Sequence, residues 1–488
     1  MLAIMFIGLI QIGINMKMLP LSATAAAFVT IFPLVGYAQT DLSVIEARLQ
    51  ALEKRAEQAE RRAAAAERKA EKLEQIINER GSAKPAISMA VSGSSTDTNV
   101  SATNPVAKPA PAIKYNNDFG ELKLYGDVEF NTDAASRQGQ ITSVRTALGK
   151  NKQPSKSDNW DINGRILIGL DGNYMKNNGN YAGFSVQPLA DMTGRMNLDD
   201  AVFYFGQQDS WQAKLGRYEA YDMFPLGQDT FVQYSGNTAN DLYSDGFGYI
   251  YMMKEGRGRS GDGGSMQLSH SLNDWYFEIN ALIEDGTALF DDANYHGYQL
   301  DNKKNVIYLR PVVAWQPNNF KVAVAMESQV INNAYGDKVD GEWKDMSKRN
   351  GYGMTLGWNS LEKDPDNGVQ LTFSSAYLDA TAEKDLSLGG YALWRRAQLG
   401  YIYAHNNIKD FNSANISTDT NVILNRIPGK YDIHTLYASY ELPRILDLDN
   451  YKIYLGAYYS KINADDPNLI SHHDDERYGV RARFKYFF

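Results

Sequence analysis

The sequence predicts an all-β transmembrane barrel preceded by an α-helical coiled coil. Three observations predict this fold class: the last strand alternates apolar and cationic residues, the chain after residue 114 consists of short alternating runs, and residues 41–80 carry a heptad repeat. No apolar run after Ala38 approaches the roughly 18 residues that a membrane-spanning helix needs. A chain that enters a membrane without such a helix must form a closed barrel, because a closed sheet pairs all of its backbone groups.

The composition of the 488 residues excludes several kinds of site. The chain contains no cysteine, so it forms neither disulfides nor thiolate metal sites. Its formal net charge of −9 argues against nucleic acid as a partner, because phosphate-rich partners select cationic surfaces.

The last strand, residues 477–488, has one apolar face and one cationic face, which suits a strand between lipid and water. The apolar face consists of Tyr478, Val480, Ala482, Phe484, Tyr486 and Phe488, and the cationic face of Arg477, Arg481, Arg483 and Lys485. An edge strand of a soluble β-domain is the alternative. The strand resembles the closing strand of bacterial outer-membrane barrels, which typically ends in Phe. This resemblance implies that Tyr486 and Phe488 form a barrel-assembly signal.

Residues 1–38 have the features of a secretory signal peptide. Lys17 precedes an apolar stretch that ends in a small-x-Ala cleavage site at Ala38. The residues before Met16 are apolar and uncharged, which is wrong for the start of a signal, so we expect translation to begin at Met16 or Met18. An uncleaved anchor helix is the alternative.

Residues 39–80 are expected to form a coiled coil. Apolar residues recur at alternating spacings of three and four over about five heptads. They are Leu42, Ile45, Leu49, Leu52, Ala56, Ala59, Ala63, Ala66, Ala70, Leu73 and Ile77. Because an alanine-rich seam associates weakly, the helix is expected to depend on a trimer assembled elsewhere; a single solvated helix is the alternative. Residues 81–114, rich in Ser, Thr, Asn and Pro, are expected to be a flexible linker.

Residues 115–488 are expected to form the barrel, and sixteen alternating runs in them are typical of strands. The runs are 122–130, 160–174, 180–187, 199–207, 210–218, 246–254, 265–272, 274–285, 306–316, 320–329, 349–359, 368–379, 391–405, 432–441, 451–461 and 478–488.

Turn lengths test this strand count, because short turns and long loops should lie on opposite sides. Residues 272–274 and 317–319 form tight turns that should be periplasmic, whereas sixteen runs put them outside. One further strand within 219–264 and another within 360–431 would restore the alternation. Eighteen strands are therefore preferred, and sixteen remain possible.

The least regular segment, residues 219–245, mixes aromatic rings with carboxylate and amide groups. Rings stack on the C–H patches of sugars while the polar groups bond hydroxyls, so the segment is a candidate sugar path. The candidate aromatic residues are Tyr218, Tyr221, Phe224, Phe231, Tyr234 and Tyr243. The candidate polar residues of a constriction are Arg195, Arg217, Glu219, Asp222, Asp229, Arg481 and Arg483. A surface loop is the alternative.

Five arginines are expected to form a cationic lumen wall opposite the acidic residues of this segment, and such a transverse field tunes ion passage. They are Arg195, Arg217, Arg477, Arg481 and Arg483. Ordinary solvated charges on the lumen face are the alternative.

Three further patterns carry no chemistry. Residues 256–261 match G-x-G-x-x-G, but no helix follows to receive a phosphate. Residues 472–476 could ligate a metal, but a solvated loop explains them better. Ser269 and His270 are adjacent and point to opposite strand faces, so no nucleophile–His pair is apparent. We therefore expect no metal, no cofactor and no enzymatic activity.

Residues 39–55 and the Ala-Glu-Arg repeats after them resemble the periplasmic extension of sucrose porins, and the barrel is similar to the glycoporins, nearest to the raffinose-porin branch. The resemblance implies an outer-membrane homotrimer in which each subunit conducts oligosaccharides of the sucrose or raffinose type. It also implies a third loop, here residues 219–245, that folds inward and narrows the lumen. Maltoporin-type channels have an aromatic slide, which the resemblance assigns to Tyr218, Tyr221, Phe224, Phe231 and Tyr234. The alternative function is a non-specific porin whose coiled coil binds peptidoglycan or a periplasmic protein.

Overall fold

The computed structural model describes residues 113–117, 120–136, 140–141, 159–228, 230, 249–256, 260, 262–290, 293–412, 428–466 and 476–488. All of them belong to the second of two compact units of the chain, residues 95–488. The predicted signal peptide and coiled coil, and nearly all of the linker, lie outside the described residues. Within the described ranges, no helix is long and apolar enough to cross a membrane.

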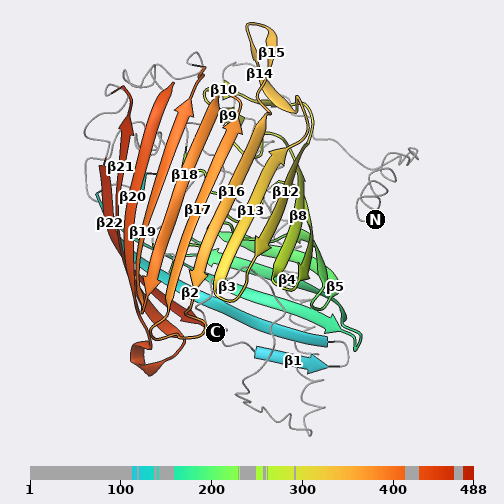
Figure 1. Cartoon of the computed structure of the whole chain (residues 1–488), viewed down its shortest axis with the longest axis vertical. Coiled ribbons are helices and arrows are strands. Elements are labelled where there is room, and N and C mark those ends of the chain that lie inside the picture. The colour runs from blue at the N-terminus through green and yellow to red at the C-terminus, as the bar shows by residue number, and fades with distance from the viewer. Residues whose placement is uncertain are drawn as a thin grey trace, which may run out of the picture. The chain divides into compact units, whose positions relative to one another are not determined.

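The described residues form a closed antiparallel barrel of sixteen strands (Figure 1). The strands are β2 (Gly120–Ala135), β3 (Asn159–Met175), β4 (Asn180–Asp191), β5 (Met196–Gln207), β6 (Trp211–Arg217), β7 (Gly264–Leu272), β8 (Trp275–Glu284), β12 (Val306–Trp315), β13 (Phe320–Gln329), β16 (Arg349–Asn359), β17 (Val369–Ala380), β18 (Glu383–Trp394), β19 (Ala397–Ile408), β20 (Gly429–Leu442), β21 (Tyr451–Ala464) and β22 (Glu476–Phe487). Pairing of β22 with β2 closes the ring.

The preferred count of eighteen strands is wrong, and the alternative of sixteen is confirmed. The predicted run 391–405 contains parts of two strands, β18 and β19, because the chain turns at Arg395 and Arg396 with positive φ. This division supplies the additional strand expected within 360–431. The predicted run 246–254 is not a barrel strand, since its residues 249–253 are all buried inside the barrel. Alternation alone did not distinguish that buried segment from a strand.

One part of the parity argument is confirmed, since the two tight turns lie at the same end of the barrel, but the described residues of 219–264 do not include the further barrel strand that it required. The β7–β8 turn and the β12–β13 turn lie at the same end of the antiparallel barrel as the last residue, Phe488. We call this end the short-turn end and the opposite end the long-loop end. In Figure 1 the short-turn end is at the bottom, beside the label C, and β14 and β15 mark the long-loop end.

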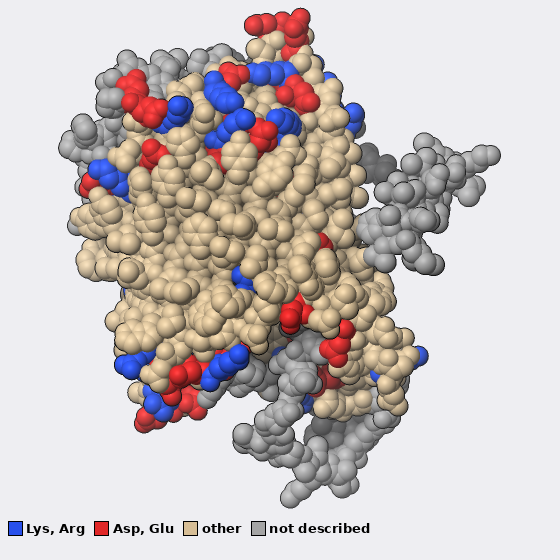
Figure 2. All heavy atoms as spheres, in the orientation of Figure 1, with Lys and Arg blue, Asp and Glu red and all other residues tan. Residues whose placement is uncertain are grey.

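The strands bury polar residues on the inner face and expose apolar residues on the outer face. On β22, Tyr478 is 59% exposed whereas Arg477 is 3% exposed. Figure 2 shows a broad band of the visible surface that carries very few charged residues. Charged residues gather above and below this band. The two faces predicted for the last strand are therefore confirmed, and the band has the character of a lipid-facing belt.

A seventeenth strand of the same sheet, β1 (Ile113–Asn117), pairs with β2 beyond the end of β22. Phe488 and Gly126 exchange two backbone hydrogen bonds of 2.8 and 3.0 Å, so β22 ends where β1 begins along the same edge of β2. The sheet thus starts two residues inside the predicted linker. The chain enters the barrel at the short-turn end.

Loops cover part of the long-loop end. They contain β9 (Asn294–Tyr295), β10 (Tyr298–Gln299), β11 (Asp301–Asn302), β14 (Tyr335–Val339) and β15 (Glu342–Asp345), and the 3-10 turn η4 (Ile445–Asp447) lies at the opposite end.

Tyr298 donates a hydrogen bond of 2.9 Å to Asp410, which also pairs with Lys344. Partial burial raises the pKa of Asp410, but the bonds from Lys344 and Tyr298 outweigh it and hold the pKa below its ordinary value.

The outer band predicts that introducing a charged side chain destabilises the barrel more within the band than outside it. Leu436 lies at the middle of β20 and is 50% exposed, whereas Leu446 lies in η4 and is 81% exposed. We expect Leu436→Arg to lower the free energy of unfolding by about 2–4 kcal/mol and Leu446→Arg by less than about 1 kcal/mol, because only the former places a cation in the hydrocarbon region. Urea unfolding in phospholipid vesicles measures both. Equal losses would contradict the assignment of the belt.

Candidate functional site

The described residues of the connection between β6 and β7 fold into the barrel. Most of them form an outgoing run, residues 218–228 with Thr230, and a return run, residues 249–256. The N–H of Met223 in the outgoing run donates a hydrogen bond of 3.1 Å to the carbonyl of Lys254 in the return run. The two runs therefore lie side by side in the interior.

The outgoing run follows the inner wall from strand to strand. The N–H of Tyr221 donates to Glu278 on β8 at 3.1 Å, and the N–H of Gln228 donates to Gln398 on β19 at 2.8 Å. Between them, the hydroxyls of Thr355 on β16 and Ser374 on β17 both donate to the carbonyl of Met223 in the loop. At the far end, the guanidinium of Arg481 on β22 donates to the carbonyl of Thr230 at 2.8 Å. The run is thus tied to the wall along most of the circumference.

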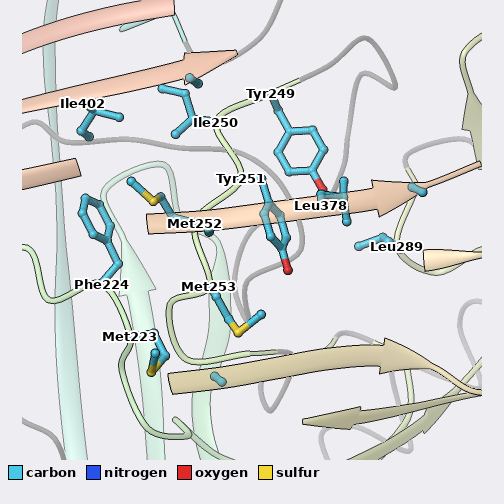
Figure 3. Packing of buried hydrophobic residues seen from close by; sticks show 14 of the residues in the cluster. Met223, Phe224, Tyr249, Ile250, Tyr251, Met252, Met253, Leu289, Leu378 and Ile402 are labelled. Carbon is cyan, nitrogen blue, oxygen red and sulfur yellow. The ribbon is translucent and has the colours of Figure 1, made fainter. Parts of the chain in front are cut away.

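The return run packs into space that glycines leave on the inner wall. A Cβ on Gly389 of β18 would lie 2.6 Å from Met252 and 2.7 Å from Phe224. Figure 3 shows the apolar side chains of both runs packed among residues of the wall strands such as Leu378 and Ile402. The interior beside β8 to β20 therefore holds a continuous core.

The predicted loop aromatics that the structure describes are all buried: Tyr221 and Phe224 belong to this core, whereas Tyr218 packs in a separate cluster with Val202 of β5 and Ala220. Tyr218, Tyr221 and Phe224 are 1%, 2% and 0% exposed, and the Tyr218 hydroxyl donates to Asn280 at 3.2 Å. Their role in a sugar path stays a prediction, but burial gives them a packing role. The other three aromatic candidates, Phe231, Tyr234 and Tyr243, lie outside the described residues.

The predicted acidic residues of the loop differ in their exposure to solvent. Asp222 is buried, and its carboxylate accepts the N–H of Phe224 at 2.8 Å. Burial raises the pKa of Asp222 to about 6, while the nearby Lys254 ammonium opposes this shift. Glu219 is exposed, and Asp229 lies outside the described residues.

Arg481 and Arg483 lie on the inner face of β22, next to acidic residues of β2. Arg481 forms a two-pronged ion pair with Asp133 at 2.6 and 2.7 Å, and Arg483 approaches Glu129 at 3.3 Å. Below them, Lys485 lies 3.7 Å from Glu129. We call these residues, together with Asp127 and Arg165, the charge ladder. Opposite charges alternate across its strands, so the wall is charge-compensated.

The other predicted arginines lie apart from the charge ladder. Arg477 is buried on the same inner face of β22. Arg217 donates hydrogen bonds of 2.8 Å to the carbonyls of Leu198, Asp199 and Ser260, which ties the end of β6 to neighbouring chain segments. Arg195 is exposed in the β4–β5 turn. The five arginines predicted as one wall thus divide into a group of three and two single positions.

The inner face of the early strands carries tyrosines that the sequence interpretation passed over. They are Tyr125 on β2, Tyr181 on β4 and Tyr204 on β5, and all three are half-buried. Their inward positions follow from the period-two alternation of predicted strands, so this signal was available. Among the described residues, no group of His, Asp and Glu could hold a metal ion.

The glycine that accommodates the loop predicts a steric test. Gly389→Val would place methyl groups where Phe224 and Met252 lie, at a cost of about 1–3 kcal/mol if the loop stays in place. We expect the loop to shift and the single-channel conductance to change. Leu386→Val, at an exposed position on the outer face of the same strand, is the control and should leave conductance unaltered. The same conductance in both variants would show that the loop does not depend on this contact.

Three solved structures are similar to this chain at low sequence identity. The anion-selective porin from Comamonas acidovorans is 13% identical with a TM-score of 0.45, over 75% of this chain and 99% of that chain. A loop-deletion mutant of OmpT, an outer membrane protein of Vibrio cholerae, is 12% identical with a TM-score of 0.42, over 76% of this chain and 100% of that chain. A mutant of the Rh. blastica porin is 12% identical with a TM-score of 0.41, over 75% and 100% of the two chains.

Comparison with curated proteins gives no match. A family model described as porin-like glycoporin RafY matches residues 124–488, which is nearly the whole barrel. This chain therefore belongs to the porin-like glycoporin RafY family and is an outer-membrane porin.

Proposed function

We propose that this porin lets oligosaccharides of the sucrose or raffinose type diffuse through a lumen narrowed by the β6–β7 loop. The observation that carries the proposal is the attachment of this loop to the inner wall. Hydrogen bonds of its described residues join it to β8, β19 and β22. The passage would therefore run along the inner faces of β2 to β5 and the charge ladder.

The lining of this passage suits neutral polyhydroxy solutes. Carboxylate, guanidinium, amide and phenol groups alternate on it, and each can exchange hydrogen bonds with sugar hydroxyls. Facilitated diffusion without energy input needs weak binding at several places, because a tight site would stall exit. A charge-compensated wall meets this requirement, since it offers many partners without a strong net field.

We also propose a homotrimer whose amino-terminal coiled coil extends into the periplasm. Entry of the chain through β1 at the short-turn end, next to Phe488, supports this arrangement. Short turns are periplasmic in outer-membrane barrels. The extension would then start on the periplasmic side.

A non-specific porin tethered by its coiled coil is the second candidate. The observation that favours it is the burial of Tyr218, Tyr221 and Phe224, which leaves little of these rings accessible to a passing solute. In this case the extension would bind peptidoglycan or a periplasmic protein. Deletion of residues 41–80 without loss of sugar flux would show that the extension tethers or stabilises the barrel and does not conduct.

The two candidates differ in sugar preference. In liposome-swelling assays we expect raffinose and sucrose to enter proteoliposomes faster than zwitterionic solutes of equal size, because the lining bonds hydroxyls. Protein-free liposomes are the control for leakage. Equal rates for the sugars and the zwitterions would favour the non-specific porin.

The charge ladder predicts the ion preference of the channel. Replacement of Arg481 and Arg483 by Gln removes the two guanidinium groups that pair with Asp133 and Glu129 and makes the wall more negative, so we expect permeability to shift toward cations. Reversal potentials in a salt gradient across planar bilayers measure this shift.

The matched control removes two cations outside the lumen. Lys430 and Lys461 pair with Asp465 and Glu476 near the long-loop end, and their replacement by Gln changes the net charge equally. We expect no shift from this control. An unchanged reversal potential in the Arg481 and Arg483 variant would show that these arginines are ordinary solvated charges that do not set the ion preference.

A further inference from the structure

The outer face of the barrel carries a row of polar side chains at the long-loop end. The strand register places its members opposite one another on six neighbouring strands. They are Ser328 of β13, Asn350 of β16, Asp379 of β17, Lys384 of β18, Asn407 of β19 and Lys430 of β20. Lys348, directly before β16, reaches Asp379 from the same face. We call these residues, Lys348 included, the outer polar row.

Two lysines converge on one carboxylate in this row. Nζ of Lys348 lies 2.7 Å from Oδ2 of Asp379, and Nζ of Lys384 lies 3.7 Å from Oδ1. The lysine side chains are 58% and 42% exposed, whereas the aspartate side chain is 24% exposed. The carboxylate therefore lies deeper than the ammonium groups and orients them, and one positive charge remains in excess. On this face, Figure 2 shows Lys and Arg side chains beside Asp and Glu side chains above the outer band.

A second cationic position lies further along the row. Lys430 is two strands away from Lys384, which is about 10 Å at the usual strand spacing. Its Nζ lies 3.8 Å from Asp465, and its side chain is 53% exposed. The outer polar row thus offers ammonium groups at two places, with the amide of Asn407 between them.

Tyrosines indicate the level of the row in the membrane. One step further into the outer band, Tyr352 of β16 lies opposite Tyr377 of β17, and Tyr352 is 46% exposed. Tyrosine rings on a lipid-facing surface gather where hydrocarbon meets headgroups, because the ring is apolar and its hydroxyl is polar. The outer polar row therefore lies at the level of the lipid headgroups.

The opposite rim of the outer band has a different chemistry. Exposed indoles lie there at the short-turn ends of three strands, Trp275 of β8, Trp315 of β12 and Trp394 of β18. The rings of Trp275 and Trp315 have centroids 6.2 Å apart. An indole suits the membrane interface without a counter-charge, whereas ammonium groups are most favourable against an anionic headgroup layer. The two rims therefore fit two different headgroup layers.

We propose that the outer polar row binds a phosphorylated glycolipid in the leaflet around the long-loop end. The ammonium groups of Lys348 and Lys384 would hold one phosphate, and that of Lys430 would hold another. The amide of Asn407 would bond the sugar between them. A disaccharide headgroup with a phosphate at each end is long enough to reach both places. The proposal goes beyond the passage of sugars and does not depend on it, because the row faces away from the lumen.

The test is binding of lipid A with two phosphates to the full-length porin in detergent, with the bound lipid counted by native mass spectrometry. Lys348→Gln combined with Lys384→Gln should raise the half-saturating lipid concentration about tenfold to thirtyfold, because each lysine near an anionic headgroup favours binding. High salt should reduce this difference. Lys176→Gln combined with Lys363→Gln, which removes two exposed cations from turns at the short-turn end, is the matched control and should leave binding unchanged.

A second pair of substitutions separates charge from packing. Lys348→Arg combined with Lys384→Arg keeps both positive charges and should retain most of the lipid binding. Equal loss of binding in the Gln and Arg variants would overturn the assignment of these lysines as phosphate partners. The electrophoretic mobility of the unheated barrel shows that all of the variants fold.

Three lipids identify the partner. Lipid A with two phosphates should bind more tightly than lipid A with one phosphate or phosphatidylglycerol, and Lys430→Gln should remove the advantage of the second phosphate. Equal binding of all three lipids would overturn the assignment to a glycolipid with two phosphates. Unchanged binding in the Lys348→Gln and Lys384→Gln double variant would overturn the outer polar row as the site. Entry of raffinose into liposomes tests the sugar porin separately from all of these outcomes.

Discussion

The attachment of the β6–β7 loop to the inner wall determines where everything else in the lumen lies. Its two runs bury their apolar side chains against β8 to β20, and glycines such as Gly389 leave space for them. A barrel of sixteen strands has room for such a loop because its wall supplies an inner surface on every strand. The loop thereby divides the interior into a packed half and a polar half.

The polar half is organised by pairing of charges across strands. Arg481 illustrates the constraint, because one guanidinium bonds Asp133 on β2 and the carbonyl of Thr230 in the loop. The same side chain thus joins wall, closure seam and loop. A buried charge without such partners would be costly, so acids and bases must occur together along this wall.

The sequence predicted the faces of the strands better than their number. Period-two alternation correctly placed Tyr478 outside and Arg481 inside, because lipid and water impose opposite residues on the two faces. It failed at residues 249–253, where both faces are buried by loop and wall, and at Arg395, where a turn without glycine or proline joins two strands. The amino-terminal predictions concern residues outside the described ranges. They remain predictions.

The sequence predicts a candidate sugar path in the loop because of the composition of this segment. A loop rich in aromatic and polar residues has the composition of a sugar site, but composition does not say which side of a ring is covered. In the structure Tyr221 and Phe224 are used to hold the loop down, whereas Tyr125 and Tyr204 lie on strands whose backbone supports one side of each ring. Composition therefore predicts that aromatic rings are present, whereas the packing of the folded chain decides whether a ring is buried under the loop or stays partly exposed on the wall.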